Sequence, residues 1–358
     1  MKARLILLAA TVMLACVAMS HAQTTDDTIK VDTRLVSVPV IVSDHDGRYI
    51  PNLQQPDFKV FQDGTEQPIA FFAATEEPVT VAILIDTSQS TRGVLGDIKD
   101  SAKSFVKLLT PRDRAMVVSF DYDIHTLSPL TSDQKQLSSA VKSAEIPDRM
   151  VGTMLRDAVY QTVNASFKGI NGRKAIIVLT DGKDAGSEIR TPDLLYRLEE
   201  SDTLVYTIMF KTDERGGNRG FGGGGRGGGF PGRGGRFPGG GGGRFPGGGG
   251  GGNPRFPGGG SPSGEQRKRM EERQKAQNAQ AAEFLKDLAD TTGARAFSSK
   301  DGKIKRTFAD ILEELRFQYR LGFYPPDEDH PSVHQLRVKV ARDNAVVRAR
   351  GSYRSQTK

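Results

Sequence analysis

Two long apolar segments, each ending in an aspartate, most constrain the fold of this chain. They read VTVAILID at residues 79–86 and KAIIVLTD at residues 174–181. A strand buried on both faces of a sheet is apolar throughout, whereas apolar and polar residues alternate in a strand with one wet face. Both segments therefore predict central strands of a sheet that is covered on both sides.

The segments between and after these two strands have the spacing of amphipathic helices. Apolar residues recur every three or four positions over residues 98–109 and again over residues 155–163. RAMVVSF at 114–120 and TLVYTIMF at 203–210 predict two further strands. Strands that alternate with helices predict an α/β fold, here a doubly wound, mostly parallel sheet flanked by helices. The strand-end aspartates would then meet at one edge of the sheet.

The two ends of the chain have an antiparallel β pattern instead. Valines at every second position of residues 36–42 indicate a strand, and Pro39 predicts a sheet edge because proline has no N–H to donate. The same alternation over residues 336–347 predicts a hairpin that turns at residues 342–344. We expect the two ends to pair, so that the α/β domain is inserted in a small all-β domain.

These patterns predict a six-part organisation of the chain. The parts are a signal peptide (1–22), an N-terminal β unit (23–77), the first part of the α/β domain (78–212), an insert (213–264), the second part of the α/β domain (265–324), and C-terminal strands (325–358) that pair with the N-terminal unit. The second part of the α/β domain begins with a helix whose first half is charged all round and which ends at Gly293.

The first residues of the chain predict export. Lys2 and Arg4 precede an apolar run at residues 5–17, and Ser-His-Ala at 20–22 is a cleavage site with small residues at its first and third positions. This run is too short to span a membrane, and no other segment is apolar and long enough. A secreted, periplasmic or cell-envelope location follows. The single cysteine, Cys16, lies in the signal and leaves a lipoprotein acylated there as the alternative.

The basic charge of the chain belongs to its insert. The net charge is +7, the signal contributes +2, and residues 216–264 contain six arginines and no acid. The remaining parts are close to neutral, which argues against a specific nucleic-acid-binding surface on the folded domains. Repeated Arg-Phe-Pro-Gly units cannot form a core and predict a disordered segment. Weak contact with polyanions is the function that such a segment suggests.

Side chains with oxygen ligands gather at the predicted ends of the two central strands. Asp86 and Asp181 end these strands, Ser88 and Ser90 follow at alternate positions, and Thr153 opens a helix predicted at the same edge. Alternate residues of an extended loop face one side and can converge. An oxygen-only set suits Mg²⁺, with Mn²⁺ or Ca²⁺ as alternatives. The two serines could instead be helix caps.

These residues resemble a known metal site. D-x-S-x-S at residues 86–90, the threonine at 153 and T-D-G at 180–182 are similar to the metal-ion-dependent adhesion site (MIDAS) of von Willebrand factor type A (VWA) domains. The resemblance covers about residues 79–323 without the insert, and the flanking segments resemble an exported bacterial branch of the family. It implies that the motif residues bind a divalent cation, with Asp181 acting largely through water.

The resemblance implies a non-enzymatic binding module, in which an Asp or Glu of a protein partner completes the coordination of the cation. A second hypothesis is a structural or surface-scaffold protein whose arginine-rich insert contacts polyanions. A hydrolytic enzyme is a third. A phosphatase with a strand-end aspartate needs a second acid at position 88, where this chain has serine, and no nucleophile–base pair is evident. The histidines outside the signal (45, 125, 330 and 334) are predicted to be scattered on the surface.

Overall fold

The fold is known from a computed structural model, which describes residues 35–74, 77–148, 152–212, 264–299, 304–326 and 330–355, without the side chain of Arg267. All of them belong to one compact unit, Leu35–Thr357. The predicted signal peptide and nearly all of the predicted insert lie outside the described residues. Both remain predictions, as do the boundaries of the six parts.

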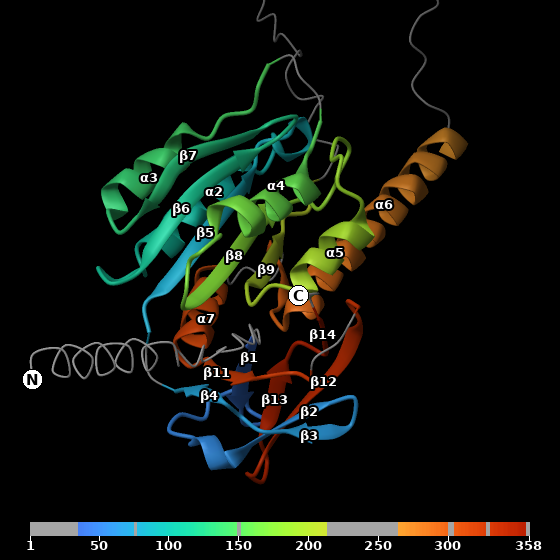
Figure 1. Cartoon of the computed structure of the whole chain (residues 1–358). Coiled ribbons are helices and arrows are strands. Elements are labelled where there is room, and N and C mark those ends of the chain that lie inside the picture. Colours follow the sequence, from blue (N-terminus) through green and yellow to red (C-terminus); the bar gives the residue numbers. More distant parts are fainter. Residues whose placement is uncertain are drawn as a thin grey trace, which may run out of the picture. The chain divides into compact units, whose positions relative to one another are not determined.

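A six-stranded sheet forms the centre of the α/β domain (Figure 1). Its order is β10-β9-β8-β5-β6-β7, and all pairs of neighbours are parallel except β6 and β7, which are antiparallel. The strands are β5 (Val79–Asp86), β6 (Arg114–Phe120), β7 (Ile124–Thr131), β8 (Arg173–Thr180), β9 (Leu204–Met209) and β10 (Ala296–Ser298). The predicted fold class is confirmed, and the two apolar segments form the adjacent central strands β5 and β8.

Helices cover both faces of this sheet. They are α2 (Leu95–Val106), α3 (Gln134–Ser143) and α7 (Ile304–Arg316) on one face, and α4 (Leu155–Gln161), α5 (Thr191–Glu199) and α6 (Gly264–Thr292) on the other. In β5, Ile83 and Ile85 face the first layer and Leu84 the second, because successive side chains of a strand alternate. Burial on both sides explains why this strand is apolar throughout.

Strand β7 and helix α3 were not predicted from the sequence. β7 is an antiparallel edge strand with one neighbour, and few of its side chains are buried, so it lacks a continuous apolar pattern. Asp133 caps α3 by accepting hydrogen bonds from the N–H groups of Lys135 and Gln136. That cap was the signal in the sequence that could have located the helix.

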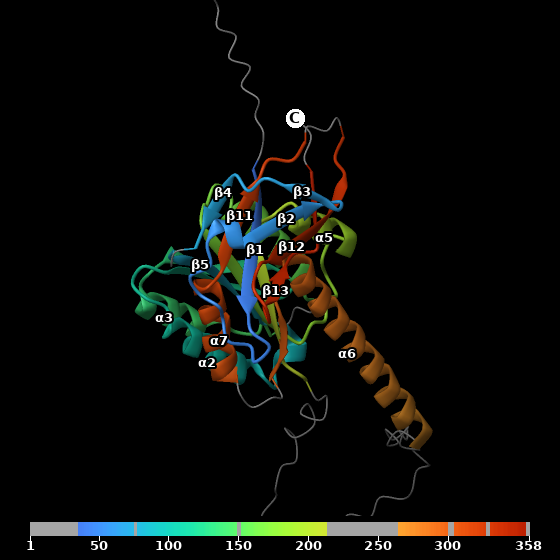
Figure 2. The ribbon, with the colours of Figure 1, turned by 90° about the horizontal axis from the view of Figure 1, so that it is seen from below.

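Two four-stranded antiparallel sheets form the all-β part, and their strands are labelled in Figures 1 and 2. Their orders are β13-β1-β11-β4 and β14-β12-β2-β3. The strands are β1 (Val36–Ser43), β2 (Phe58–Gln62), β3 (Thr65–Gln67), β4 (Phe71–Ala73), β11 (Tyr319–Phe323), β12 (Val333–Val340), β13 (Val346–Ala349) and β14 (Ser352–Arg354). One apolar cluster includes Val40, Phe58 and Leu321. The expected pairing of the two chain ends is confirmed.

The prediction that Pro39 marks an edge strand is wrong for β1 as a whole. β1 lies between β11 and β13. Pro39 is opposite Arg320 of β11, however, and pairing with β13 starts only at Val40. At Pro39 the strand has a neighbour, β11, on one side only. Because no strand lies on the β13 side at this position, the missing N–H of proline costs no hydrogen bond there.

The hairpin predicted at residues 342–344 is also wrong. β12 pairs with β2 and β14, whereas β13 pairs with β1, so the chain crosses from one sheet to the other between them. Asn344, with φ of 64°, lies in this crossing. Alternation shows that one face of a strand is buried. Both sheets offer such a face, so the pattern does not specify the neighbour.

Helix α6 joins the α/β domain only through its C-terminal part. Ala281, Leu285 and Leu288 are buried, whereas most residues of the first half are exposed. Gly293, with φ of +78°, follows the helix as predicted. In the part of the chain that the structure describes, α6 and the other helices are too short or too polar to cross a membrane.

Candidate metal centre

Two buried aspartates lie at the carboxyl ends of the central strands. Asp86 is the last residue of β5 and Asp181 follows β8. The two strands are adjacent and parallel, with Ile85 opposite Leu179. Asp86 is 0% exposed and Asp181 is 1% exposed. The sheet therefore brings two carboxylates, 95 positions apart in sequence, to one edge.

The loop after β5 brings two hydroxyls beside Asp86. The N–H of Ser88 donates to Asp86 Oδ1 over 2.9 Å, and Ser88 Oγ lies 3.0 Å from Ser90 Oγ. Ser88 precedes the 3₁₀ turn Gln89–Thr91 without a side-chain capping bond, and the N-cap of α2 is Val94. The two hydroxyls therefore do not cap the following helix.

The environment of Asp86 disfavours its negative charge. Burial, with the charge of Asp181 as the second cause, raises the pKa of Asp86 to about 7, although hydrogen bonds from Ser88 and Thr180 act in the opposite direction. Thr180 Oγ1 donates to Asp86 Oδ2 over 2.5 Å and accepts a bond from the N–H of Gly182. A positive charge next to Asp86 would favour the ionised carboxylate.

Asp181 has donors on both of its oxygens. The N–H of Lys183 donates to Oδ1 over 3.2 Å, and Thr212 Oγ1 donates to Oδ2 over 3.1 Å. Lys183 Nζ forms an ion pair with Oδ2 at 3.2 Å. Thr212 is the last described residue before the predicted insert.

Thr153 is placed beside the same edge by backbone hydrogen bonds. It is 5% exposed and precedes Met154, the N-cap of α4. Its carbonyl accepts from the N–H of Ala185 over 3.1 Å, and the N–H of Met154 donates to the carbonyl of Asp121 over 2.7 Å. The side chain of Asp121 in turn accepts a hydrogen bond from Thr87 Oγ1 over 2.8 Å. Thr87 lies between Asp86 and Ser88 in the sequence. These contacts link Thr153 to the loops that carry Asp86 and Asp181.

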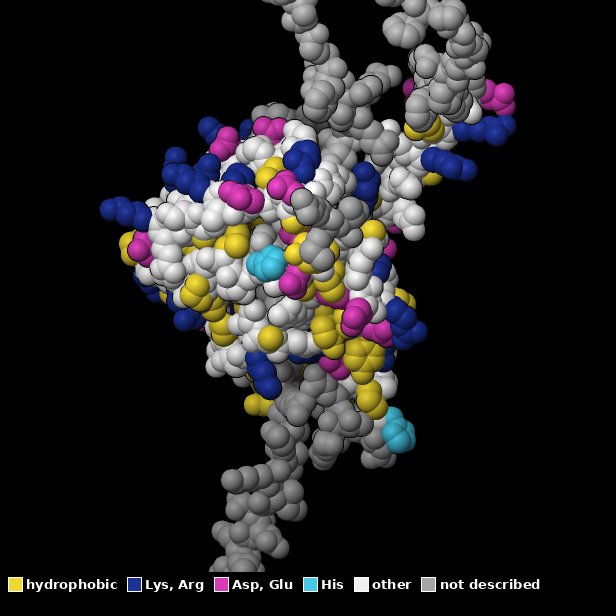
Figure 3. Space-filling view, turned by 90° about the horizontal axis from the view of Figure 1, so that it is seen from above, with side chains coloured by type: hydrophobic (Ala, Val, Ile, Leu, Met, Phe, Trp, Pro, Cys, Tyr) yellow, Lys and Arg dark blue, Asp and Glu magenta, His cyan; other side chains and the backbone are white. Residues whose placement is uncertain are grey.

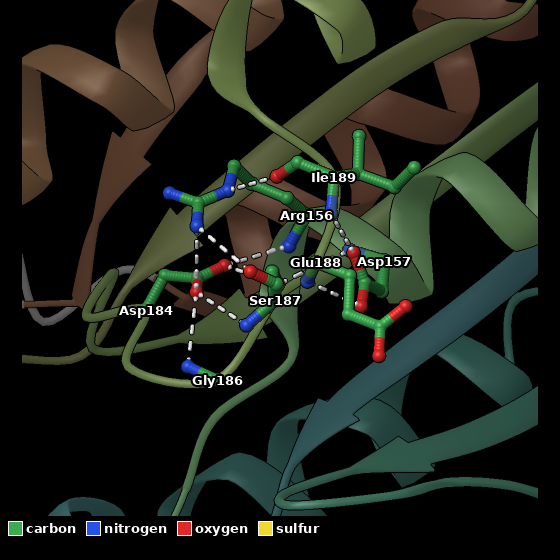
Figure 4. Close-up of polar contacts among 7 residues, drawn as sticks. All are labelled: Arg156, Asp157, Asp184, Gly186, Ser187, Glu188 and Ile189. Atoms are coloured by element: carbon green, nitrogen blue, oxygen red, sulfur yellow. Dashed lines mark hydrogen bonds and ion pairs between the residues drawn. The ribbon is translucent and has the colours of Figure 1, made fainter.

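A carboxylate clamp, defined by Asp157 and Asp184, fastens the loop after Asp181 to the start of α4 (Figure 4). Asp184 accepts from the N–H of Arg156 over 2.8 Å and from Ser187 Oγ over 2.7 Å. Asp157 accepts from the N–H groups of residues 188 and 189, each over 2.9 Å. The clamp holds the segment that contains Ala185, and therefore the contact to Thr153.

Part of the chain matches a known family. The family model described as the von Willebrand factor type A domain matches residues 80–219. The chain contains a VWA domain. The α/β fold extends beyond the matched residues, because strand β10 of the sheet and helices α6 and α7 follow in the sequence.

Solved structures similar to this chain share only part of it. They are BatB of Bacteroides thetaiotaomicron (24% identity, 37% of this chain and 66% of that chain, TM-score 0.32), the vWF domain of the type V pili tip protein Mfa5 from Porphyromonas gingivalis (27%, 30% and 39%, 0.27), and proximal thread matrix protein 1 from the mussel byssus with a zinc-occupied MIDAS motif (18%, 40% and 38%, 0.35). The chain covers less than two thirds of each. These TM-scores are low. A search of curated proteins found no match.

The donor set of the VWA domain fits a hard divalent cation. Carboxylate and hydroxyl oxygens are the ligands of Mg²⁺, Mn²⁺ and Ca²⁺. Among the described residues no group of three or more His, Cys, Asp or Glu could hold a metal ion, so a cation here would need hydroxyls as well as carboxylates. Asp86 and Asp181 are buried, and their negative charges repel each other. Such a cation would offset this repulsion and stabilise both carboxylates in their ionised form.

A second polar cluster, which the sequence did not reveal, lies in the β part. Ser332 Oγ is 2.8 Å from His334 Nε2, and His334 Nδ1 is 2.7 Å from Asp63 Oδ2. His334 is buried, which corrects the prediction of a surface histidine. A serine, a histidine and an aspartate linked in this order also form the catalytic triad of hydrolases. Here the N–H of Ser332 is bonded to Ser355 Oγ and that of Gln335 to Asp63, so these donors are not available to stabilise an oxyanion. We assign the cluster a structural role.

Two features of the candidate metal centre carried no recognisable signal in the sequence. Lys183 pairs with Asp181, and α6 packs on the loop after β8. A Cβ on Gly182, whose φ is +80°, would lie 2.9 Å from Leu285 and 3.0 Å from Ala281 of α6. Only a glycine permits both this conformation and this close approach.

Proposed function

We propose that the protein is an exported binding module that holds a divalent cation at Asp86, Ser88, Ser90, Thr153 and Asp181 and recognises a carboxylate of a protein partner. The observation that carries the proposal is the pair of buried aspartates at adjacent strand ends, with two hydroxyls beside Asp86. VWA domains are typically protein-interaction modules, which supports binding over catalysis.

The roles of the residues follow from their surroundings. Asp86, with Ser88 and Ser90 on the adjoining loop, would bind the cation directly. Asp181 would act largely through water, as the resemblance to the adhesion site implies, because Lys183 already forms an ion pair with its Oδ2. A bound cation with few charged ligands supplies Lewis acidity for an Asp or Glu side chain. Surrounding surface would then provide most of the affinity and selectivity.

The identity of the ion and the destination of the protein belong to the same proposal. We favour Mg²⁺ because the donors are all oxygen, with Mn²⁺ or Ca²⁺ as alternatives. Export rests on the signal-like sequence at residues 1–22. Weak polyanion contact by the insert remains a second proposal. It is supported by the six arginines of residues 216–264.

Metal and carboxylate binding test this function together. In calorimetry with MgCl₂ after EDTA treatment, the wild type and the surface control Asp100→Ala should bind Mg²⁺, and Asp86→Ala should not. Asp100 is suitable because its side chain is 80% exposed on α2. With Mg²⁺ present, N-acetyl-aspartate amide should shift NMR signals of the protein, and N-acetyl-asparagine amide should not. An equal response of wild type and Asp86→Ala to Mg²⁺ and EDTA would show that the proposal is wrong.

A further inference from the structure

A pocket of about 330 Å³ lies next to the candidate metal centre and is not used by it. Its walls come from the end of β6, from β7 and from the segment after α3. They include Asp121, Glu145 and Asp148, together with the apolar side chains of Leu127 and Ile146. The described residues that line the pocket include no lysine or arginine.

The pocket shares hydrogen bonds with the loops of the metal centre. Asp121, in its wall, accepts from Thr87 Oγ1, and the carbonyl of Asp121 accepts from the N–H of Met154, next to Thr153. Gln89, between the two MIDAS serines, donates its side-chain N–H to the carbonyl of Pro147, another wall residue. A ligand with a carboxylate at the metal centre would therefore have its neighbouring groups beside the pocket.

The lining of the pocket has free capacity for hydrogen-bond donors. Ser119 is 4% exposed and lines the pocket, and no described residue forms a hydrogen bond with its hydroxyl. Neither Glu145 nor Asp148 forms an ion pair with another described residue. Across the end of the molecule seen in Figure 3, basic and acidic side chains are interspersed.

We propose that this pocket binds an arginine side chain of the same partner whose Asp or Glu reaches the metal centre. A guanidinium offers five donors, which suits the carboxylates of Glu145 and Asp148 and the hydroxyl of Ser119. The aliphatic stem would pack on Leu127 and Ile146. A volume of about 330 Å³ is at the lower end of the range of ligand pockets and has room for one long side chain. The partner motif is thus an acidic residue followed or preceded at short range by arginine. This inference rests on the proposed function.

Blocked peptides of the form Ac-Asp-(Gly)n-Arg-NH₂, with none to three glycines, test the proposal on the full chain at pH 8 with Mg²⁺. The matched probes carry citrulline, which has the shape of arginine without its charge. We expect at least one arginine peptide to bind about fivefold more tightly than its citrulline counterpart. It should also shift the methyl NMR signals of Leu127 and Ile146.

Two double variants complete the experiment. Glu145→Gln with Asp148→Asn should remove the preference for arginine without weakening Mg²⁺ binding. The matched control, Glu283→Gln with Glu313→Gln, removes two exposed charges from α6 and α7 and should retain the preference for arginine. Equal, Mg²⁺-dependent binding of arginine and citrulline peptides would overturn the pocket assignment and leave the proposed function intact. A preference that survives in the first variant would also overturn it. If no aspartate peptide binds with Mg²⁺, the proposed function fails and this inference fails with it.

Discussion

At the scale of the residue, the buried carboxylate of Asp86 decides what the strand end can do. It is fully buried beside Asp181, and burial raises its pKa to about 7. A group in this position costs stability when it is ionised and has no compensating positive charge. A cation bound as proposed above would compensate this cost.

Asp86→Asn tests this cost directly. Because asparagine is neutral and has nearly the same shape, the metal-free variant should be more stable than the metal-free wild type at pH 8 by about 1–3 kcal/mol. With Mg²⁺ the order should reverse, since only the wild type gains stability from the cation. Urea unfolding with EDTA or with Mg²⁺ measures both differences. A variant that is less stable than the wild type in EDTA would contradict this account.

Asp63 makes a pH-dependent contribution to the stability of the β part. It lies in the turn between β2 and β3, and the hydrogen bond from His334 is the main cause that lowers its pKa. A carboxylate with a lowered folded-state pKa stabilises the fold above its unfolded pKa of about 4, and this contribution is lost as the pH falls through the folded value. Asp63→Asn should therefore cost about 0.5–1 kcal/mol at pH 7, because the side chain is half-exposed.

The check on Asp63 is the difference in unfolding free energy between wild type and variant, measured from pH 7 to pH 2. It should shrink toward zero on acidification. Asparagine tolerates the positive φ of 49° at this position, so the turn itself is kept. A difference that stays constant with pH would show that the charge has no role.

At the scale of the element, the start of α4 and the loop after β8 behave as one piece. The carboxylate clamp satisfies backbone N–H groups at the start of the helix and in the loop, and the same loop bonds to Thr153. Orphan donors at helix starts are commonly satisfied in this way. Here the satisfaction also fixes a candidate metal ligand that comes from a third segment of the chain.

Asp184→Ala should weaken Mg²⁺ binding as well as stability. Loss of the carboxylate leaves the N–H of Arg156 and the hydroxyl of Ser187 without their partner, which costs about 1–3 kcal/mol. We expect at least a threefold rise in the Mg²⁺ dissociation constant, measured by calorimetry well below the melting temperature. The control Asp193→Ala removes an exposed ion pair with Arg190 and should change neither quantity much. Unchanged Mg²⁺ affinity in Asp184→Ala would limit the clamp to a stabilising role.

At the scale of the whole molecule, Arg350 connects segments that are far apart in the sequence. Its guanidinium donates to the carbonyls of Glu199, at the end of α5, and of Ser201, over 2.9 Å each, and to that of Ser37 in β1 over 2.6 Å. The residue is 5% exposed, and burial lowers its pKa to about 10, so it stays charged at pH 7. One side chain thus satisfies three carbonyls from the α/β and β parts.

Arg350→Met should destabilise the protein by about 2–4 kcal/mol, because three acceptors lose a charged donor. The control Arg337→Met, at an exposed position of β12, should cost less than about 0.5 kcal/mol. Chemical unfolding, followed by circular dichroism, measures both. If the midpoints of the two variants coincide, Arg350 does not stabilise the contact between these segments.

Patterns of apolar residues in the sequence determined the fold class and the strand ends. Continuous apolar runs predicted β5 and β8, and helical spacing predicted the helices between them, because burial on two faces or on one stripe imposes these periods directly. The candidate ligands were predicted for the same reason, since parallel neighbours end at one edge. The pattern of apolar residues along the strands was therefore enough to predict that the candidate metal ligands lie at one edge of the sheet.

Tertiary structure decided everything that depends on which segments become neighbours. Alternation could not show that β12 and β13 lie in different sheets, or that β1 gains a second neighbour just beyond Pro39. The partners of the site residues were equally hidden: Lys183 on Asp181, the clamp on the loop beside Thr153, and the acidic pocket beside the serines. Such contacts join residues tens of positions apart. Their energies depend on distance and burial, and a linear pattern contains neither.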